Sequence, residues 1–210
     1  MRRVFVDPEA PQRDALQEAA KWIRNGGLVA LPTDTLYGLG ADPFRSDAVA
    51  RVFMVKGRAA GRALPLIAAD AAQIVVHLGP LSPAAERLAA KFWPGPLTLL
   101  VPAPVALVRD VTGGSGRVGV RVPANAIARA ICRAAGRPIT ATSANRSGQP
   151  ATADPEEVER TFGQDVDLLI DAGPTRGGAP STIVDVTGPT PQLVRPGAVS
   201  WSEIQAWLGE

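Results

Sequence analysis

The chain has 210 residues, of which 46% are apolar and 20% charged, and its formal net charge is +2. This composition excludes a disordered chain, and the small net charge does not require a nucleic-acid partner. The single cysteine, Cys132, excludes an intramolecular disulfide and a cysteine-based metal cluster. The sequence has neither the apolar run that would span a bilayer nor the apolar core of a secretion signal at its start, so we expect a cytoplasmic protein.

Apolar periodicity and turn residues predict alternating helices and strands in the first half of the chain. Asp7 and Pro8 are typical of a helix start, and we expect this helix to continue through Ile23 and to end at Gly26. The elements expected next, in chain order, are a strand over 28–32, a helix from Ser46, a strand over 63–70, a helix around His77, a helix from Ser82 and a strand over 97–101.

The second half continues the alternation. Residues 117–122 place valine at every second position, which indicates a strand, and a helix is expected from Pro123 to Gly136. The remaining expected elements are strands within 138–145, 166–173, 181–186 and 191–197, a helix from Asp154 and a final helix over 200–209. Since no linker or repeat interrupts the series, the sequence predicts one α/β domain over residues 1–210 with a mostly central sheet.

Several common kinds of site are excluded by their residues. GSGRVG (114–119) fits the dinucleotide pattern G-x-G-x-x-G, but the alternating valines after it predict a loop before a strand instead of the required helix. No Walker-type phosphate loop occurs. The only histidine, His77, is expected to be structural, and with Cys132 it makes neither a nucleophile–base pair nor a metal site.

Small hydroxyl side chains and arginines gather in a few loop segments. LPTDTLYGLGADPF (31–44) has two threonines, an aspartate and a tyrosine within five positions, followed by Gly38 and Gly40, which are expected to let the backbone pass close to a ligand. Segments of the same kind are 55–62, 118–123, 140–150, 179–185 and 193–197. Alone, each is typical of an ordinary turn. Together they favour a site in which neutral donors orient an amino acid while Lys or Arg binds phosphate.

These motifs resemble the YrdC/Sua5 family of threonylcarbamoyl-AMP synthases. The matching motifs are PTDTLYGLGAD (32–42), VKGR with LPL after it (55–66), FWPGPLTLL (92–100), VGVRVP (118–123), ATSANRSGQP (141–150), PSTIVD (180–185) and VRPGA (194–198). The resemblance implies an α/β fold with an open, twisted, mixed sheet flanked by helices, a deep basic cavity, and a core over about residues 15–200. Within this family, the chain resembles the short, single-domain members.

The resemblance implies a nucleotidyltransferase that makes threonylcarbamoyl-AMP and pyrophosphate from L-threonine, bicarbonate or CO2, and ATP. Mg²⁺ is expected to enter with ATP, because no carboxylate cluster suggests a protein cage. The product would serve the t6A modification of adenosine 37 in tRNAs that read ANN codons, through a downstream threonylcarbamoyl transferase complex. Two alternatives stay open: an RNA-binding protein of the same fold, in contact with tRNA or other RNA, and a paralogue with another carbamoyl-type activity. No membrane partner is expected.

Site residues follow from the motif positions that match the family. The resemblance implies catalytic roles for Lys56 and Arg58. The ATP-binding residues that it implies are Lys56, Arg58, Arg62, Arg117, Ser143, Asn145 and Arg195, and the threonine-binding residues are Thr35, Arg121 and Ser181. The role of Asp34 stays open between a local cap and a ligand contact. Ala59 and Ala63 stand where many members have proline, which predicts a freer 56–65 loop.

Overall fold

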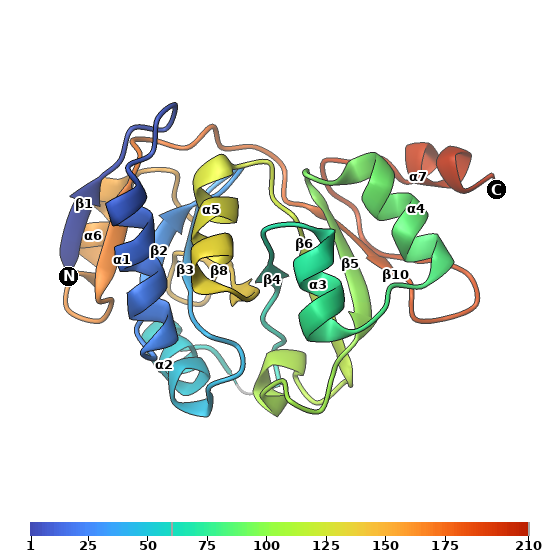
Figure 1. The fold of residues 1–210 in the computed structure, drawn as a ribbon, viewed down its shortest axis with the longest axis horizontal. Coiled ribbons are helices and arrows are strands. Elements are labelled where there is room, and N and C mark those ends of the chain that lie inside the picture. The colour runs from blue at the N-terminus through green and yellow to red at the C-terminus, as the bar shows by residue number, and fades with distance from the viewer. Residues whose placement is uncertain (60, 210) are drawn as a thin grey trace.

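A computed structural model of the chain describes residues 1–59 and 61–209. Its strands form two mixed sheets, each flanked by helices, and the two sheets lie next to each other in Figure 1. The α/β class with a mixed sheet is confirmed, but the expectation of one mostly central sheet is wrong. The division falls at Ala141, because the strand before it pairs in one sheet and the strand after it pairs in the other.

Sheet A has the strand order β1-β9-β2-β3-β8. Its strands are β1 (Arg2–Phe5), β2 (Val29–Pro32), β3 (Tyr37–Gly40), β8 (Thr142–Ser143) and β9 (Leu168–Asp171). β9 pairs in parallel with β1 and β2, whereas β2 and β3 form an antiparallel hairpin that places Leu31 opposite Gly38. The hairpin loop therefore carries residues 33–36, the central part of the threonine-rich motif.

Sheet B has the strand order β11-β10-β5-β6-β4-β7. Its strands are β4 (Leu66–Ile67), β5 (Leu97–Pro102), β6 (Arg117–Arg121), β7 (Ile139–Thr140), β10 (Thr182–Asp185) and β11 (Gln192–Arg195). The parallel pairing of β10 with β5 places Ile183 opposite Thr98. Segments that are more than 80 residues apart in sequence thus meet in this sheet.

The helices are α1 (Arg13–Arg24), α2 (Ser46–Lys56), α3 (Ala71–Leu78), α4 (Pro83–Phe92), the short 3₁₀ helix η1 (Arg109–Thr112), α5 (Ala126–Ala135), α6 (Pro155–Phe162) and α7 (Trp201–Leu208). Side-chain caps explain several starts: the Ser82 hydroxyl accepts from the Ala85 amide at 3.3 Å, and the Asp154 carboxylate accepts from Glu156 at 2.9 Å. The expected strand over 117–122 and the loop before it are confirmed.

Two expectations about helix starts are wrong. The first helix begins at Arg13 and not at Asp7, because the Asp7 carboxylate accepts from the Glu9 amide in a separate turn. The helix expected from Pro123 begins at Ala126, where Asn125 provides the cap. Strands β1 and β3 were not expected at all.

The core joins the two sheets. Helices α1 and α5 pack against each other over one face of sheet A, where Figure 1 shows them nearly parallel. The larger apolar cluster contains Ala30 and Leu39 of sheet A together with Leu99 and Val120 of sheet B. Because one cluster extends across both sheets, their facing edges are held together by buried apolar side chains. Within the described residues, no helix combines the length and the apolar character needed to cross a membrane.

Candidate active site

A cavity of about 560 Å³ opens between the facing edges of the two sheets. The hairpin loop of sheet A contributes Thr35 and strand β8 contributes Ser143, while sheet B contributes Thr98, Arg121 and Ser181 from its strands and their ends. This volume is in the range of small-molecule sites. Seven of the residues implied by the family resemblance line it: Thr35, Arg58, Arg62, Arg121, Ser143, Ser181 and Arg195.

Among the described residues, the charged side chains that line the cavity are all arginines: Arg58, Arg62, Arg121 and Arg195. Burial, and then the charge of Arg62, lower the pKa of Arg58. Burial and the charge of Arg121 lower the pKa of Arg195 in the same way. Neighbouring like charges in a partly buried cavity favour an anionic ligand, because the ligand relieves their repulsion.

Arg58 is positioned by its own loop. Helix α2 ends at Gly57, whose left-handed backbone (φ 58°) turns the chain immediately before Arg58. The Arg58 side chain then donates through Nε to the Arg62 carbonyl at 3.1 Å and through Nη2 to the Ala63 carbonyl at 2.7 Å. These two bonds hold the guanidinium at the cavity wall.

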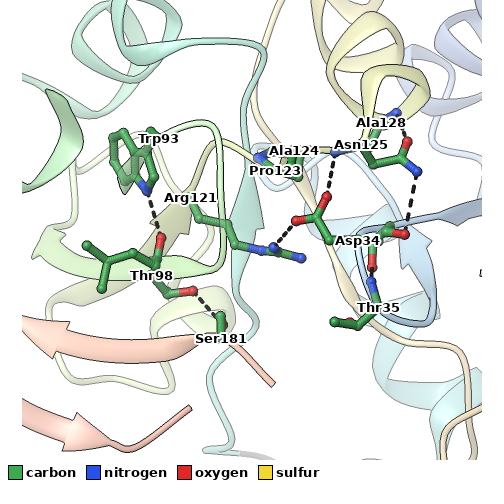
Figure 2. A network of polar contacts seen from close by, with 12 residues as sticks. Asp34, Thr35, Trp93, Thr98, Arg121, Pro123, Ala124, Asn125, Ala128 and Ser181 are labelled. Atoms are coloured by element: carbon green, nitrogen blue, oxygen red, sulfur yellow. Dashed lines mark hydrogen bonds and ion pairs between the residues drawn. The ribbon is translucent and has the colours of Figure 1, made fainter. Parts of the chain in front are cut away.

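Hydroxyl groups from both sheets also line the cavity. The Ser181 hydroxyl lies 2.8 Å from the Thr98 hydroxyl, and Arg195 donates through Nη2 to the Ser181 carbonyl at 2.6 Å. The Thr35 carbonyl accepts from the Thr175 hydroxyl at 2.6 Å, which ties the hairpin loop to the segment after β9. Figure 2 shows Arg121 between the Thr98–Ser181 pair and the segment that carries Thr35.

Arg121 forms an ion pair with Asp34. Its Nη1 lies 2.5 Å from the Asp34 carboxylate, and both side chains are 13% exposed. Figure 2 shows the two groups directed toward each other from different elements. The structure thus gives Asp34 a contact with a cavity residue.

Lys56 and Asn145 lie behind the cavity wall instead of lining it. The Lys56 ammonium donates to the carbonyls of Ser143 at 2.5 Å and Asn145 at 2.7 Å, and only 2% of the residue is exposed. The Asn145 side chain accepts from the Ser143 hydroxyl at 2.5 Å and donates to the Gln149 carbonyl at 2.6 Å. In this structure both side chains hold the segment that presents Ser143, and their contacts with ATP stay predictions.

Arg117 is also outside the cavity lining. Its guanidinium, on β6, pairs with Asp185 on β10, and nearly half of the Arg117 side chain is exposed. The two strands lie on either side of β5, so the pair bridges them at the surface of the sheet. Its ATP contact likewise stays a prediction.

Thr98 is a cavity residue that the motif reading did not single out. It is 3% exposed, and its hydroxyl faces Ser181. The signal was present in the sequence, because Thr98 is the one polar residue in the apolar run LTLLV (97–101). Gly38 lines the cavity as expected, but Gly40 does not. A Cβ at position 40 would lie 2.8 Å from the Leu31 side chain, so close packing explains the glycine there.

Within residues 1–59 and 61–209, no three His, Cys, Asp or Glu side chains lie close enough together to hold a metal ion. The charged lining groups described above are cations, which repel Mg²⁺. The residues present therefore do not fit a protein-bound Mg²⁺ cage.

Comparison with known proteins identifies a family that matches most of the chain. The model of the Sua5/YciO/YrdC family, described as "Telomere recombination", matches residues 21–197. The threonylcarbamoyl-AMP synthase of Pyrococcus abyssi is 43% identical over 192 residues, and that of Bacillus subtilis is 38% identical over 212 residues. They align with 91% and 99% of this chain.

A solved structure of P. abyssi Sua5 in complex with L-threonine has the same fold. It superposes with a TM-score of 0.93 at 40% identity and covers 100% of this chain. The chain spans 62% of that protein, and 56% and 61% of the two curated relatives.

Proposed function

The chain belongs to the Sua5/YciO/YrdC family, and we propose that it is an L-threonylcarbamoyl-AMP synthase, a nucleotidyltransferase acting on L-threonine, bicarbonate and ATP. The observation that carries the proposal is the single cavity between the sheets. It combines four arginines, which suit phosphate and carboxylate groups, with the hydroxyls of Thr35, Thr98 and Ser181, which suit an amino acid. A relative of the same fold has been solved with L-threonine.

The first step of the proposed reaction forms a carbamate. Bicarbonate gives CO2 with loss of hydroxide, and the threonine amine attacks the CO2 carbon. An N–C bond forms as one C=O π bond opens to leave a carboxylate oxygen, and the nitrogen loses a proton to solvent. Arg121 binds the threonine carboxylate, while Thr35 and Ser181 contact its polar groups. The carbamate is unstable in water, so a partly enclosed cavity that holds it beside the nucleotide favours the next step.

In the second step a carbamate oxygen attacks the α-phosphorus of ATP. The new P–O bond forms as the bond to the β-phosphate oxygen breaks, and pyrophosphate leaves with that electron pair. Arg58, Arg62 and Arg195 stabilise the charge on the phosphate oxygens. Mg²⁺ enters as part of the ATP substrate. No covalent enzyme intermediate is required, which agrees with a cavity of arginines and hydroxyls.

The test is pyrophosphate release with L-threonine, with L-serine and without an amino acid, each with ATP and bicarbonate. We expect release that depends on L-threonine. Release without amino-acid dependence, or salt-sensitive RNA binding with no ATP turnover, would contradict the proposal and favour the carbamoyl-type paralogue or the RNA-binding protein.

Arg58→Ala tests the assignment of the phosphate side. We expect turnover to fall by about 10²–10³-fold with little change in stability, because the variant removes a preorganised cation from the cavity. The matched control is Arg87→Ala: Arg87 also donates to two backbone carbonyls, those of Trp207 and Leu208, but lies outside the cavity lining. Near-parental turnover of Arg58→Ala would show that the assignment is wrong.

A further inference from the structure

Asp34 lies in the hairpin loop between Thr33 and Thr35, yet it does not line the cavity that holds the arginines. It lines a second cavity of about 510 Å³ on the other side of the loop, next to the start of α5. Asp34 therefore lies behind the lining of the main cavity, beside the lining residue Arg121.

Both carboxylate oxygens of Asp34 are used. Oδ2 accepts from Nη1 of Arg121 at 2.5 Å, and Oδ1 accepts from the backbone amide of Asn125 at 2.5 Å. The Asn125 side chain in turn caps α5 through the Ala128 amide at 3.0 Å. One carboxylate thus joins three elements: the hairpin loop of sheet A, the end of β6 in sheet B and the start of α5 (Figure 2).

This arrangement fixes one nitrogen of Arg121 and leaves the others for a ligand. In the part of the chain that the structure describes, Nε and Nη2 of Arg121 make no hydrogen bond to protein. Arg195 lies close enough for its pKa to be lowered by the Arg121 charge, so the two cations repel each other. Asp34 opposes that repulsion by holding Arg121 from the side away from the cavity.

We infer that Asp34 is a positioning residue, which holds the Arg121 guanidinium in the orientation that binds the carboxylate of threonine. The inference rests on the proposed function. A planar guanidinium binds a carboxylate through two parallel hydrogen bonds, and this geometry demands a fixed orientation. The carboxylate of Asp34 supplies it because the loop, the strand and the helix start all hold that group in place.

Asparagine does not replace Asp34 in this role. Its side chain has one oxygen and one NH2 group, so it accepts from either Arg121 or the Asn125 amide while the NH2 group faces the remaining donor. Asp34→Asn therefore keeps the size of the side chain but removes its charge, and it cannot accept from Arg121 and the Asn125 amide at the same time. We expect the KM for L-threonine, and its dissociation constant measured by calorimetry without ATP, to rise about tenfold or more, while the KM for ATP stays within about twofold.

Asp167→Asn is the matched control. The Asp167 carboxylate also binds one guanidinium, that of Arg51 at 3.0 Å, and one backbone amide, that of Leu28 at 2.7 Å, but it does not line the cavity. We expect Asp167→Asn to change thermal stability and leave the KM for L-threonine unchanged.

A double-variant test separates positioning from an independent effect. If Asp34 acts through Arg121, the kcat/KM for L-threonine of Asp34→Asn/Arg121→Gln will equal that of Arg121→Gln alone. Losses that multiply would overturn the inference. An unchanged KM for L-threonine in Asp34→Asn would also overturn it, because Asp34 would then be dispensable. Loss of the cooperative unfolding transition in Asp34→Asn would overturn it too, because Asp34 would then be needed for the fold. Parental protein that binds L-threonine but releases no pyrophosphate would overturn the proposed function and leave this inference tested by calorimetry.

Discussion

Lys56 is a cation placed where water barely reaches it. Its ammonium donates to the carbonyls of Ser143 and Asn145. The backbone carbonyl of Lys56 accepts from the Ser147 amide at 2.7 Å. Burial, followed by the charge of Arg58, lowers the pKa of Lys56 to about 8. At the residue scale, Lys56 therefore joins the end of α2 to the segment that presents Ser143 to the cavity.

Replacing Lys56 by methionine tests this role. The variant leaves the Ser143 and Asn145 carbonyls without their donor, so we expect the unfolding free energy at pH 7.5 to fall by about 1–3 kcal/mol. The folded pKa of about 8 lies below the ordinary 10.5, so between these values the unfolded chain binds more protons and the stability of the parent rises with pH. Lys56→Met lacks this rise.

Urea unfolding at pH 7.5, 8.5 and 9.5 measures the difference between parent and variant, which should grow with pH. The control is Lys21→Met, because Lys21 is exposed on α1. A difference that is constant over this range would contradict the buried position of the Lys56 ammonium.

The motif K-x-R predicted the positions of Lys56 and Arg58 but not their directions. Gly57 lies between them and ends α2 in the left-handed conformation, so Lys56 remains within the helix and packs inward while Arg58 turns toward the cavity. The glycine was visible in the sequence. The consequence for each neighbour depends on what packs around the helix end, and a motif does not contain that information.

At the scale of elements, the segment between β11 and α7 is packed tightly against the cavity wall. A side chain at Gly197 would place its Cβ 2.3 Å from the Pro180 carbonyl oxygen and 2.5 Å from the Ser181 carbonyl carbon. The glycine after β11 therefore lets two backbones approach where Ser181 and Arg195 meet.

Gly197→Ala should move the segment that carries Ser181. We expect a loss of about 1–3 kcal/mol in unfolding free energy and a higher KM for L-threonine, because backbone atoms must shift to admit the methyl group. Chemical unfolding and pyrophosphate kinetics measure both effects. Gly188→Ala in the β10–β11 connection is the control, since its Cβ would meet only the Thr190 carbonyl oxygen at 3.8 Å. Equal behaviour of the two variants would contradict the close approach at Gly197.

Elements with local signals could be predicted, and those that depend on distant partners could not. Ser82 and Asp154 marked the starts of α4 and α6 because a cap acts within three residues. Strand β1 has the sequence RRVF, which lacks an apolar alternation, and it forms because it pairs with β9, more than 160 residues later. Strand β3 contains two glycines that a single-strand pattern disfavours, yet both β2 and β8 pair with it.

At the scale of the whole molecule, the central feature is a cationic cavity in a chain whose net charge is only +2. Its walls come from segments between Thr33 and Arg195, and the apolar cluster shared by the sheets keeps them together. The resemblance to a family predicted that these segments converge. Periodicity alone did not, because it reports which residues are buried and not which strands pair across 80 or more residues.

We propose that a threonine carbamate, and not the threonine carboxylate, attacks the α-phosphate of ATP in this cavity. The most direct measurement is mass spectrometry of the product formed from ATP, L-threonine and 13C-bicarbonate. We expect an adenylate that contains threonine and one 13C atom, formed together with pyrophosphate and absent when any substrate is omitted. An unlabelled threonyl-adenylate, or no adenylate at all, would contradict it.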